Sequence, residues 1–239
     1  MSAVDFYFDP VCPFAWITSK WVRLVAEEID LDVGWRFISL RLLNSDKDYA
    51  THFPAGYEEG HTTGLRLLRV AAAVRDRHGP DAVGGFYAAV GAAIFESGRG
   101  AQARAQADLP AFTAALLDGL GLDAALAEAL DDRAHDDVVG AETERALTLA
   151  GRDVGTPILQ FAPPEGTAFF GPVISRLPDR ADAVALWHHV EGLAGFAGFA
   201  EPKRSLREVP QLSAFGIDPG TAGAEHDWHQ GRRPDTLGS

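Results

Sequence analysis

The hydrophobic pattern begins with a short apolar segment, residues 4–8, rich in aromatic and β-branched side chains, which predicts a β-strand. Apolar residues then recur mostly at spacings of three and four from about Pro13 to Ile29, which predicts a helix with one apolar side. Residues 33–40 first alternate and then end apolar, which predicts a second strand. A strand–helix–strand unit of this length implies a parallel pair of strands joined by a right-handed crossover.

The next hundred or so residues carry only helical patterns. The predicted helices share apolar stripes or clear capping and stop signals, and they cover residues 57–78, 81–97, 108–119, 123–130 and 136–150. No strand pattern interrupts them. The sequence therefore predicts a helical subdomain, residues 44–151, inserted between the second and third strands.

Strand patterns return after this insert. Residues 154–161 and 167–174 predict a hairpin-like pair, and a last helix is expected at 180–193. Residues 199–239 have no periodicity and are rich in proline, glycine and charge, so we expect an extended or partly disordered C-terminal tail. Residues 1–43 and 152–198 together are expected to form one α/β domain.

Composition narrows the function classes. A net charge of −13 argues against binding to nucleic acids or to an anionic membrane surface, and no apolar run approaches the roughly 20 residues that span a bilayer. The single cysteine excludes an internal disulfide and a thiolate metal cluster and fits a reducing cytoplasm, where we expect the protein. His226 and His229 have a metal-ligand spacing, but two histidines in a tail are a weak signal, so no metal is expected.

Cys12 is the strongest candidate for chemistry. It follows the first strand and the Asp9-Pro10 turn and directly precedes Pro13, a residue well suited to the first position of a helix. Free N–H groups and the helix dipole favour an anion at such a terminus. The thiol is therefore expected to be shifted toward thiolate. The alternative interpretation is a buried, inert cysteine.

Two motifs carry a resemblance to a known family. They are Cys12-Pro13-Phe14-Ala15 at the start of the first helix and Gly155-Thr156-Pro157 at the third strand. With the order of elements, they resemble the DsbA family of the thioredoxin superfamily over about residues 3–195. Within that family, the string Asp-Pro-Val-Cys-Pro-Phe-Ala-Trp-Ile-Thr-Ser at 9–19 is most similar to actinobacterial mycothiol-dependent oxidoreductases, including the nitroreductase type.

The resemblance implies an α/β thioredoxin fold with the helical insert and a cis peptide bond before Pro157. It also implies a thiol-disulfide oxidoreductase that uses mycothiol or another low-molecular-weight thiol. Expected partners are this thiol and a disulfide or an electrophilic substrate such as a nitroaromatic; a homodimer is left open. No Gly-x-Gly-x-x-Gly follows a strand, so no flavin is expected.

The chain departs from the family's dithiol members at Ala15, where they carry a second cysteine. No internal disulfide can therefore resolve an intermediate on Cys12. Either the protein works as a monothiol enzyme, with a small thiol completing the cycle, or Ala15 replaces a resolving cysteine.

The remaining site residues are expected around this motif. Phe14 is expected to be exposed at the rim and to stack on a flat substrate, whereas Trp21 is expected in the core. Asn44 is either a polar contact for the thiol or a local cap. Tyr57, His61 and Arg69 of the insert either line a cleft between the two parts of the fold or are solvated surface residues. The candidates for binding substrate or thiol are Trp16, Asn44, Tyr57, His61, Thr156 and Pro157, with Arg69 one helical stripe further on.

Two other functions stay open. One is an enzyme resembling kappa-class glutathione transferases or 2-hydroxychromene-2-carboxylate isomerases, which share this fold but usually carry serine at the position of Cys12. The other is a thioredoxin-like binding or chaperone module without catalysis. Thiolate reactivity at Cys12 separates the module from the enzymes, and the effect of Cys12→Ser separates the two enzymes.

Overall fold

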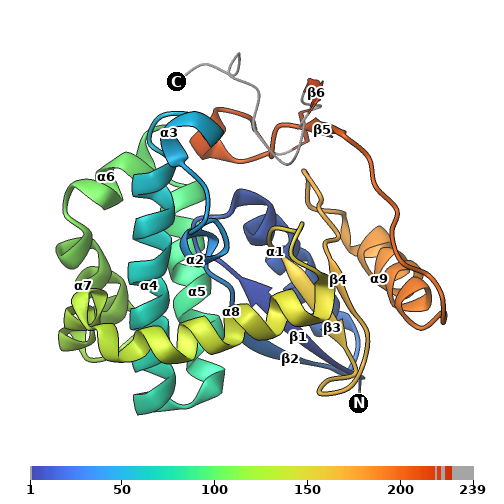
Figure 1. The fold of residues 1–239 in the computed structure, drawn as a ribbon, viewed down its shortest axis with the longest axis horizontal. Coiled ribbons are helices and arrows are strands. Elements are labelled where there is room, and N and C mark those ends of the chain that lie inside the picture. Colours follow the sequence, from blue (N-terminus) through green and yellow to red (C-terminus); the bar gives the residue numbers. More distant parts are fainter. Residues whose placement is uncertain (1, 219, 222–223, 228–239) are drawn as a thin grey trace.

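A four-stranded mixed sheet lies at the centre of the computed structural model, which describes residues 2–218, 220–221 and 224–227 (Figure 1). The strand order is β2-β1-β3-β4. The strands are β1 (Ser2–Phe8), β2 (Leu31–Phe37), β3 (Ile158–Phe161) and β4 (Ala168–Phe170). The β1–β2 pair is parallel, and β3 pairs antiparallel with both β1 and β4. The predicted parallel unit and the predicted hairpin are both confirmed.

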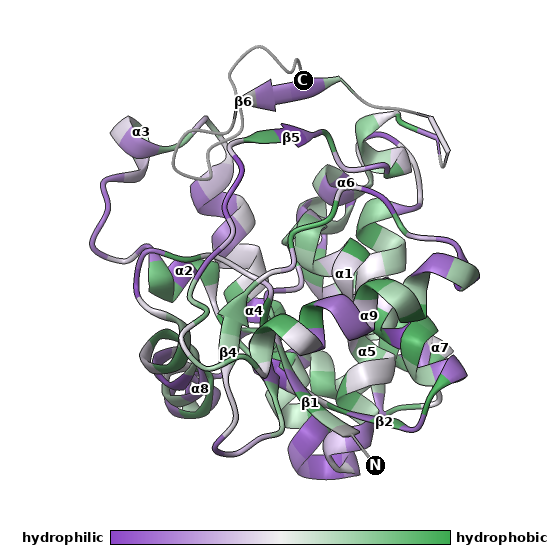
Figure 2. Ribbon diagram, turned by 90° about the vertical axis from the view of Figure 1, so that its right-hand side faces the viewer, coloured by the Kyte–Doolittle hydropathy of each residue, from purple (hydrophilic) through white to green (hydrophobic). Residues whose placement is uncertain are grey.

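Helices cover both faces of this sheet. Helix α1 (Pro13–Glu28) contacts α9 (Arg180–Ala194) on one face. Helix α8 (Asp136–Ala150) crosses the opposite face (Figure 2). These are the positions that a β-α-β unit and its returning helices are expected to take.

All regular elements of the chain between β2 and β3 are helices, as predicted. Its elements before α8 are α2 (Leu40–Leu43), α3 (Tyr49–His52), α4 (Tyr57–His78), α5 (Pro80–Phe95), α6 (Ala101–Ala107), α7 (Leu109–Gly119), and the 3₁₀ helices η1 (Ala124–Asp131) and η2 (Arg133–His135). The two long helices α4 and α5 pack against each other, and α5 also contacts β2. The second strand, predicted at residues 33–40, was predicted to end too late. The observed strand β2 ends at Phe37, and helix α2 already begins at Leu40.

An aromatic cluster joins the sheet to the insert. Phe8 stacks on Tyr87 of α5 with ring centroids 3.9 Å apart, and Trp35 lies edge-on to both. On the same face of the sheet, the fully buried Trp21 packs against Trp187 of α9, as expected for a core residue. These contacts fix the start of α1, and with it Cys12, relative to both parts of the fold.

Part of the predicted tail is folded rather than free. Strands β5 (Leu206–Glu208) and β6 (Glu225–Asp227) pair antiparallel, and the 3₁₀ helix η3 (Ser213–Phe215) follows β5. The side chains of Val209 and Leu212 are buried. Apolar residues are few in this stretch and have no regular spacing, so the hydrophobic pattern did not predict that they are buried. No helix in the described part of the chain is long and apolar enough to cross a membrane.

Candidate active site

Cys12 occupies the N-cap position of α1. Its Sγ accepts a hydrogen bond from the Ala15 amide at 3.5 Å, and Pro13 fills the first helical position, as the sequence predicts. The thiol in turn donates to the backbone carbonyl of Thr156 at 3.4 Å. The fold therefore brings together the two motifs that are 144 residues apart in the chain.

The turn opposite Cys12 has the predicted backbone. The Thr156–Pro157 peptide bond is cis. The Thr156 side chain is buried, and its hydroxyl donates to the Tyr7 carbonyl of β1 at 3.2 Å. Both sides of Thr156 are thus used: the hydroxyl holds the turn against the sheet, and the carbonyl points at the sulfur.

The expectation of a thiolate is wrong for this arrangement. The Cys12 side chain is 8% exposed, and burial raises the pKa of its thiol to about 12, because the charged form would lose its hydration. The Ala15 amide lowers this pKa, and the charge of Asp9 raises it further. The loss of hydration outweighs the helix N-terminus, so the sulfur is neutral here and acts as a hydrogen-bond donor.

The neighbouring residues are more deeply buried than predicted. Phe14 was expected at an exposed rim, but it is only 7% exposed and lies in a small apolar cluster with Cys12 and Ala15, against which Leu40 and Val173 pack. Trp16 is also buried, and its Nε1 donates to Glu96, the C-cap residue of α5, at 3.2 Å. Neither ring offers a free face to a substrate in this state.

Asp9 is a second buried ionisable group at the site. Its carboxylate accepts hydrogen bonds from the Val11 amide at 3.0 Å and the Leu40 amide at 2.8 Å. Burial nevertheless raises its pKa to about 7, and the two amides oppose this shift. Asp9 thus joins the turn before Cys12 to the start of α2.

Asn44 takes the capping role that the sequence left as an alternative. Its amide nitrogen donates to the Leu40 carbonyl at 2.8 Å at the end of α2, and its oxygen accepts from Lys47 at 2.7 Å. The side chain is 4% exposed. In this arrangement the Asn44 side chain serves as a local cap.

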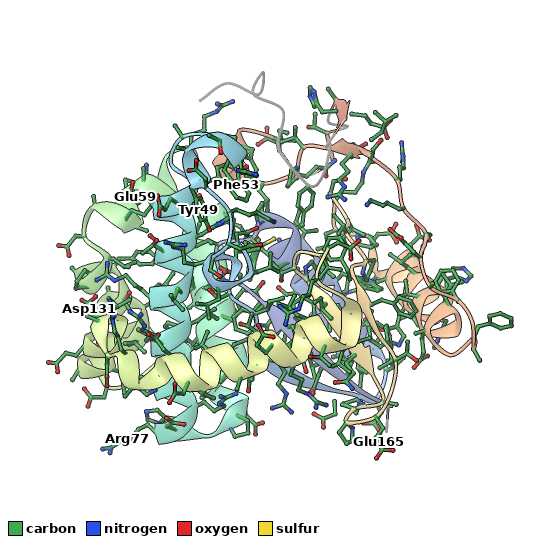
Figure 3. The ribbon with its side chains drawn as sticks, in the orientation of Figure 1. Tyr49, Phe53, Glu59, Arg77, Asp131 and Glu165 are labelled. Atoms are coloured by element: carbon green, nitrogen blue, oxygen red, sulfur yellow. The ribbon has the colours of Figure 1, made fainter. Side chains whose placement is uncertain are left out.

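His61 and Tyr57 belong to an aromatic cluster with Tyr49 and Phe53. The Tyr49 hydroxyl and His61 Nδ1 are 2.9 Å apart, and Phe53 stacks on Tyr57. His61 is buried, which corrects its interpretation as a surface residue, and burial lowers its pKa to about 4. Tyr49 begins α3 and Phe53 caps its end, and both lie at the opposite end of the molecule from Arg77 (Figure 3).

This cluster is tied to the cysteine region through α2. Leu40 of α2 packs against the apolar cluster of Cys12, and the Arg41 guanidinium lies 5.0 Å from the centroid of the Tyr49 ring. Arg69, by contrast, is held away by a bidentate bond to Asp136 and is buried rather than exposed.

Sequence reasoning missed Tyr49, Val173 and Arg207. The half-buried Arg207 of β5 lies over Phe14, with its Cζ 6.0 Å from the ring centroid, and its charge lowers the pKa of Cys12. Tyr49 and Arg207 stand in no motif or periodic pattern, and Val173 lies in a predicted strand that nothing in the sequence links to Cys12, so only the folded chain places them at the site.

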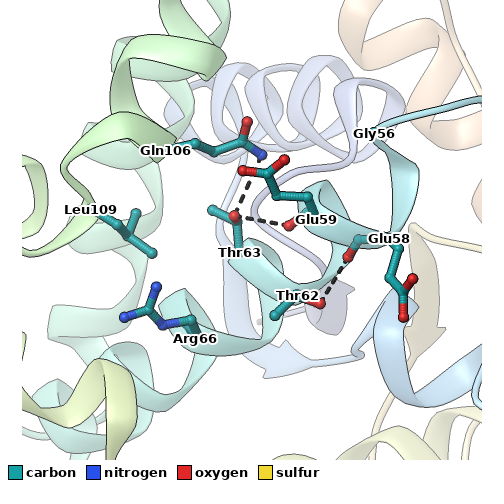
Figure 4. A pocket seen from close by; sticks show the side chains of 8 residues that line it. All are labelled: Gly56, Glu58, Glu59, Thr62, Thr63, Arg66, Gln106 and Leu109. Carbon is teal, nitrogen blue, oxygen red and sulfur yellow. Dashed lines mark hydrogen bonds between the residues drawn. The ribbon is translucent and has the colours of Figure 1, made fainter.

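A surface hollow over the first turns of α4 contains none of the residues around Cys12 (Figure 4). It is lined by Gly56, Glu58, Glu59, Thr62, Thr63, Arg66, Gln106 and Leu109. Within the described ranges, no three His, Cys, Asp or Glu side chains converge in a way that could hold a metal ion. His226 lies in β6, and His229 is outside the described residues.

Comparisons with known proteins agree with this picture. Residues 11–204 match the Rv2466c-like family model, described as mycothiol-dependent nitroreductase Rv2466c. The chain is also 33% identical over 207 residues to the uncharacterized protein Rv2286c of Mycobacterium tuberculosis, a match covering 85% of this chain and 82% of that protein.

Two solved structures show the fold. The cytosolic disulfide reductase DsbM from Pseudomonas aeruginosa has a TM-score of 0.52 at 17% identity, covering 80% of this chain and 99% of that one. A probable DsbA oxidoreductase from Streptomyces coelicolor has a TM-score of 0.50 at 16% identity, covering 89% and 98%. The predicted DsbA-like thioredoxin fold is thereby confirmed.

Proposed function

The chain belongs to the Rv2466c-like family and is a thiol-dependent oxidoreductase of the DsbA type, and we propose that Cys12 alone carries its reaction, with mycothiol as the thiol cofactor. The observation that carries this proposal is the position of the Cys12 sulfur. It sits at the start of α1 and faces the Thr156 carbonyl across 3.4 Å.

The proposed first step is an exchange of disulfides. The Cys12 thiol loses its proton, and the thiolate attacks one sulfur of a disulfide. One S–S bond forms between Cys12 and that sulfur, the original S–S bond breaks, and the other half leaves as a thiolate that takes up a proton. Ionisation also removes the hydrogen bond to Thr156, which leaves its carbonyl free to accept an N–H from the bound thiol.

A second thiol then completes the cycle. Ala15 stands where an internal thiol would attack, so the mixed disulfide on Cys12 is opened by a free low-molecular-weight thiol. That attack releases a small-molecule disulfide and restores the Cys12 thiolate. The family description favours mycothiol for both halves. A reducing cytoplasm is the compartment in which this single thiol stays free.

Reduction of nitroaromatics is a further part of the proposal, because the family description names it. Two thiols supply two electrons and two protons, so one nitro group becomes a nitroso group and water while one disulfide forms. The substrate would have to enter a site that is opened relative to this arrangement, because Phe14 and Trp16 are both buried.

Turnover with defined thiols tests the proposal. The protein is assayed for reduction of a low-molecular-weight disulfide with mycothiol or glutathione as the reductant, beside Cys12→Ser. We expect turnover with mycothiol and its loss in the serine variant. Turnover that survives Cys12→Ser would favour the isomerase-like or transferase-like enzyme. Absence of turnover with any thiol, together with an unreactive Cys12, would favour the binding module. Equal rates with both thiols would remove the mycothiol assignment.

A further inference from the structure

The chain after α9 returns across the molecule, past β5, toward α3 (Figure 1). We refer to residues 204–218 as the C-terminal segment. It is fixed first to the loop after β4: the Gln211 amide donates to the Ser175 carbonyl at 2.7 Å, and Glu208 accepts from the Ser175 hydroxyl at 3.2 Å. Arg176 adds an ion pair with the same Glu208 carboxylate.

The segment is fixed at its far end to the helical insert. Leu212 is 3% exposed and belongs to the main core, with Phe215 packed against the same core. Gly216 has a φ of +68°, and a Cβ on it would overlap the guanidinium of Arg99. The segment therefore joins the sheet domain to the insert, and β5 takes part in the first of these two attachments through Glu208.

Arg207 is placed by this segment and differs from its neighbours in having no counter-ion. Arg204 pairs with Glu225 and Arg176 with Glu208, whereas Arg207 makes no ion pair with any of the described residues. Its guanidinium lies over Phe14, in the apolar cluster that contains Cys12. Burial lowers the pKa of Arg207, and Cys12 opposes that shift. A half-buried cation is thus held beside the only cysteine of a chain with a net charge of −13.

We propose that Arg207 is the positioning residue that supplies the counter-charge for the Cys12 thiolate. This inference rests on the proposed function only in taking the Cys12 sulfur as the reacting atom.

The other charges at the site explain why a cation is needed. Asp9 raises the pKa of Cys12, and Tyr87 is a buried acid within electrostatic reach of the same sulfur. On the side of Arg207, His226 lies opposite in β6, and Glu208 is already paired. In a poorly hydrated site an opposite charge acts more strongly than in water. Arg207 therefore sets how much thiolate is present when a disulfide enters.

The test compares Arg207→Met with Arg207→Lys. Both keep a long unbranched stem and both remove the guanidinium, so their difference reports the charge. The rate of alkylation of Cys12 by uncharged iodoacetamide is measured against pH. Over the pH range in which the alkylation rate still rises with pH, we expect the Met variant to react about tenfold more slowly than the wild type at each pH. This is equivalent to a shift of the rate–pH curve by about one pH unit toward higher pH. The Lys variant should stay within about threefold of the wild type, because it keeps a cation there.

Lys203→Met is the matched control, since Lys203 is an exposed cation four residues earlier in the chain. It should leave the profile unchanged. Equal profiles for the Met and Lys variants would overturn the inference, as would faster alkylation of the Met variant. Wild-type protein that is alkylated but exchanges with no disulfide would contradict the proposed function alone, because iodoacetamide reports thiolate without disulfide exchange.

Discussion

The Cys12 thiol donates a hydrogen bond to the Thr156 carbonyl at 3.4 Å. This contact joins the start of α1 to the turn before β3 and accounts for the state of the sulfur. A thiol that donates must hold its proton, and a buried cysteine that is only 8% exposed lacks the water that would stabilise a charge. The folded protein in this arrangement therefore presents a buried, protonated sulfur rather than a thiolate.

The first prediction concerns the pH dependence of this sulfur. Because burial raises the pKa of Cys12 to about 12, the alkylation rate of ligand-free protein should still rise about tenfold per pH unit between roughly pH 7 and pH 9. The rate is obtained by stopping the alkylation at a series of times and measuring the alkylated fraction by intact mass. An alkylation rate that no longer changes with pH above neutral pH would show that the thiol is already ionised there and that burial does not raise its pKa.

The second prediction concerns the missing second thiol. Ala15 is fully buried, and its amide already contacts the Cys12 sulfur. Ala15→Cys should place a thiol in reach of Cys12, at a cost of about 1–3 kcal/mol for the added volume. After reaction with a small disulfide, the variant should lose its adduct and finish two hydrogens lighter, with an internal disulfide. Persistence of the adduct, as expected for the wild type, would show that residue 15 cannot reach it.

The third prediction tests the packing that supports Trp16. A Cβ at Gly91 of α5 would overlap the Trp16 ring, whereas a Cβ at the exposed Gly85 of the same helix meets nothing. Gly91→Ala should lower the free energy of unfolding by about 1–3 kcal/mol. Gly85→Ala should leave it unchanged or raise it by up to about 1 kcal/mol, because alanine is the better helix former. Urea unfolding of both variants provides the comparison, and equal effects would contradict the tight Trp16 contact.

The fourth prediction concerns Asp9 and stability. Its pKa is raised from 3.8 to about 7, so between these values the folded protein holds a proton that the unfolded chain has lost. This carboxyl should therefore lower the free energy of unfolding as pH rises from about 4 to 7. His61, with its lowered pKa, contributes the opposite slope.

Asp9→Asn isolates the effect, because the contribution of His61 cancels in the difference between wild type and variant. The wild type should lose stability relative to the variant as pH rises through this window. The variant has only one oxygen for two amide donors, so its stability at low pH should be lower than that of the wild type. A difference that is independent of pH would mean that Asp9 keeps its ordinary pKa.

Much of the fold was predictable because its signals are local. The strand at 4–8, the helix opened by Pro13 and the long helices predicted at 57–78 and 81–97 follow from periodicity and capping, which need no knowledge of the tertiary structure. The second of these helices is observed at Pro80–Phe95. The position of Cys12 at the N-cap of α1 was predictable from the sequence for the same reason.

The state of the site was not predictable, because it depends on contacts between distant segments. The helix N-terminus suggested a thiolate, but the loss of hydration depends on how distant residues such as Val173 and Leu40 pack against the cluster that contains Cys12. Phe14 is buried within this same cluster rather than exposed at a rim. Arg207 stands in a stretch without regular spacing, and its relation to Phe14 exists only in the folded chain.

Intact mass is the most direct test that Cys12 is the single reacting sulfur. Wild type and Cys12→Ser are each incubated with mycothiol disulfide and, separately, with glutathione disulfide, at mildly alkaline pH. We predict one adduct per chain with the mass of one mycothiol on the wild type, none on Cys12→Ser, and release of the adduct by added mycothiol. No adduct on folded wild-type protein, or the same adduct on Cys12→Ser, would contradict the account.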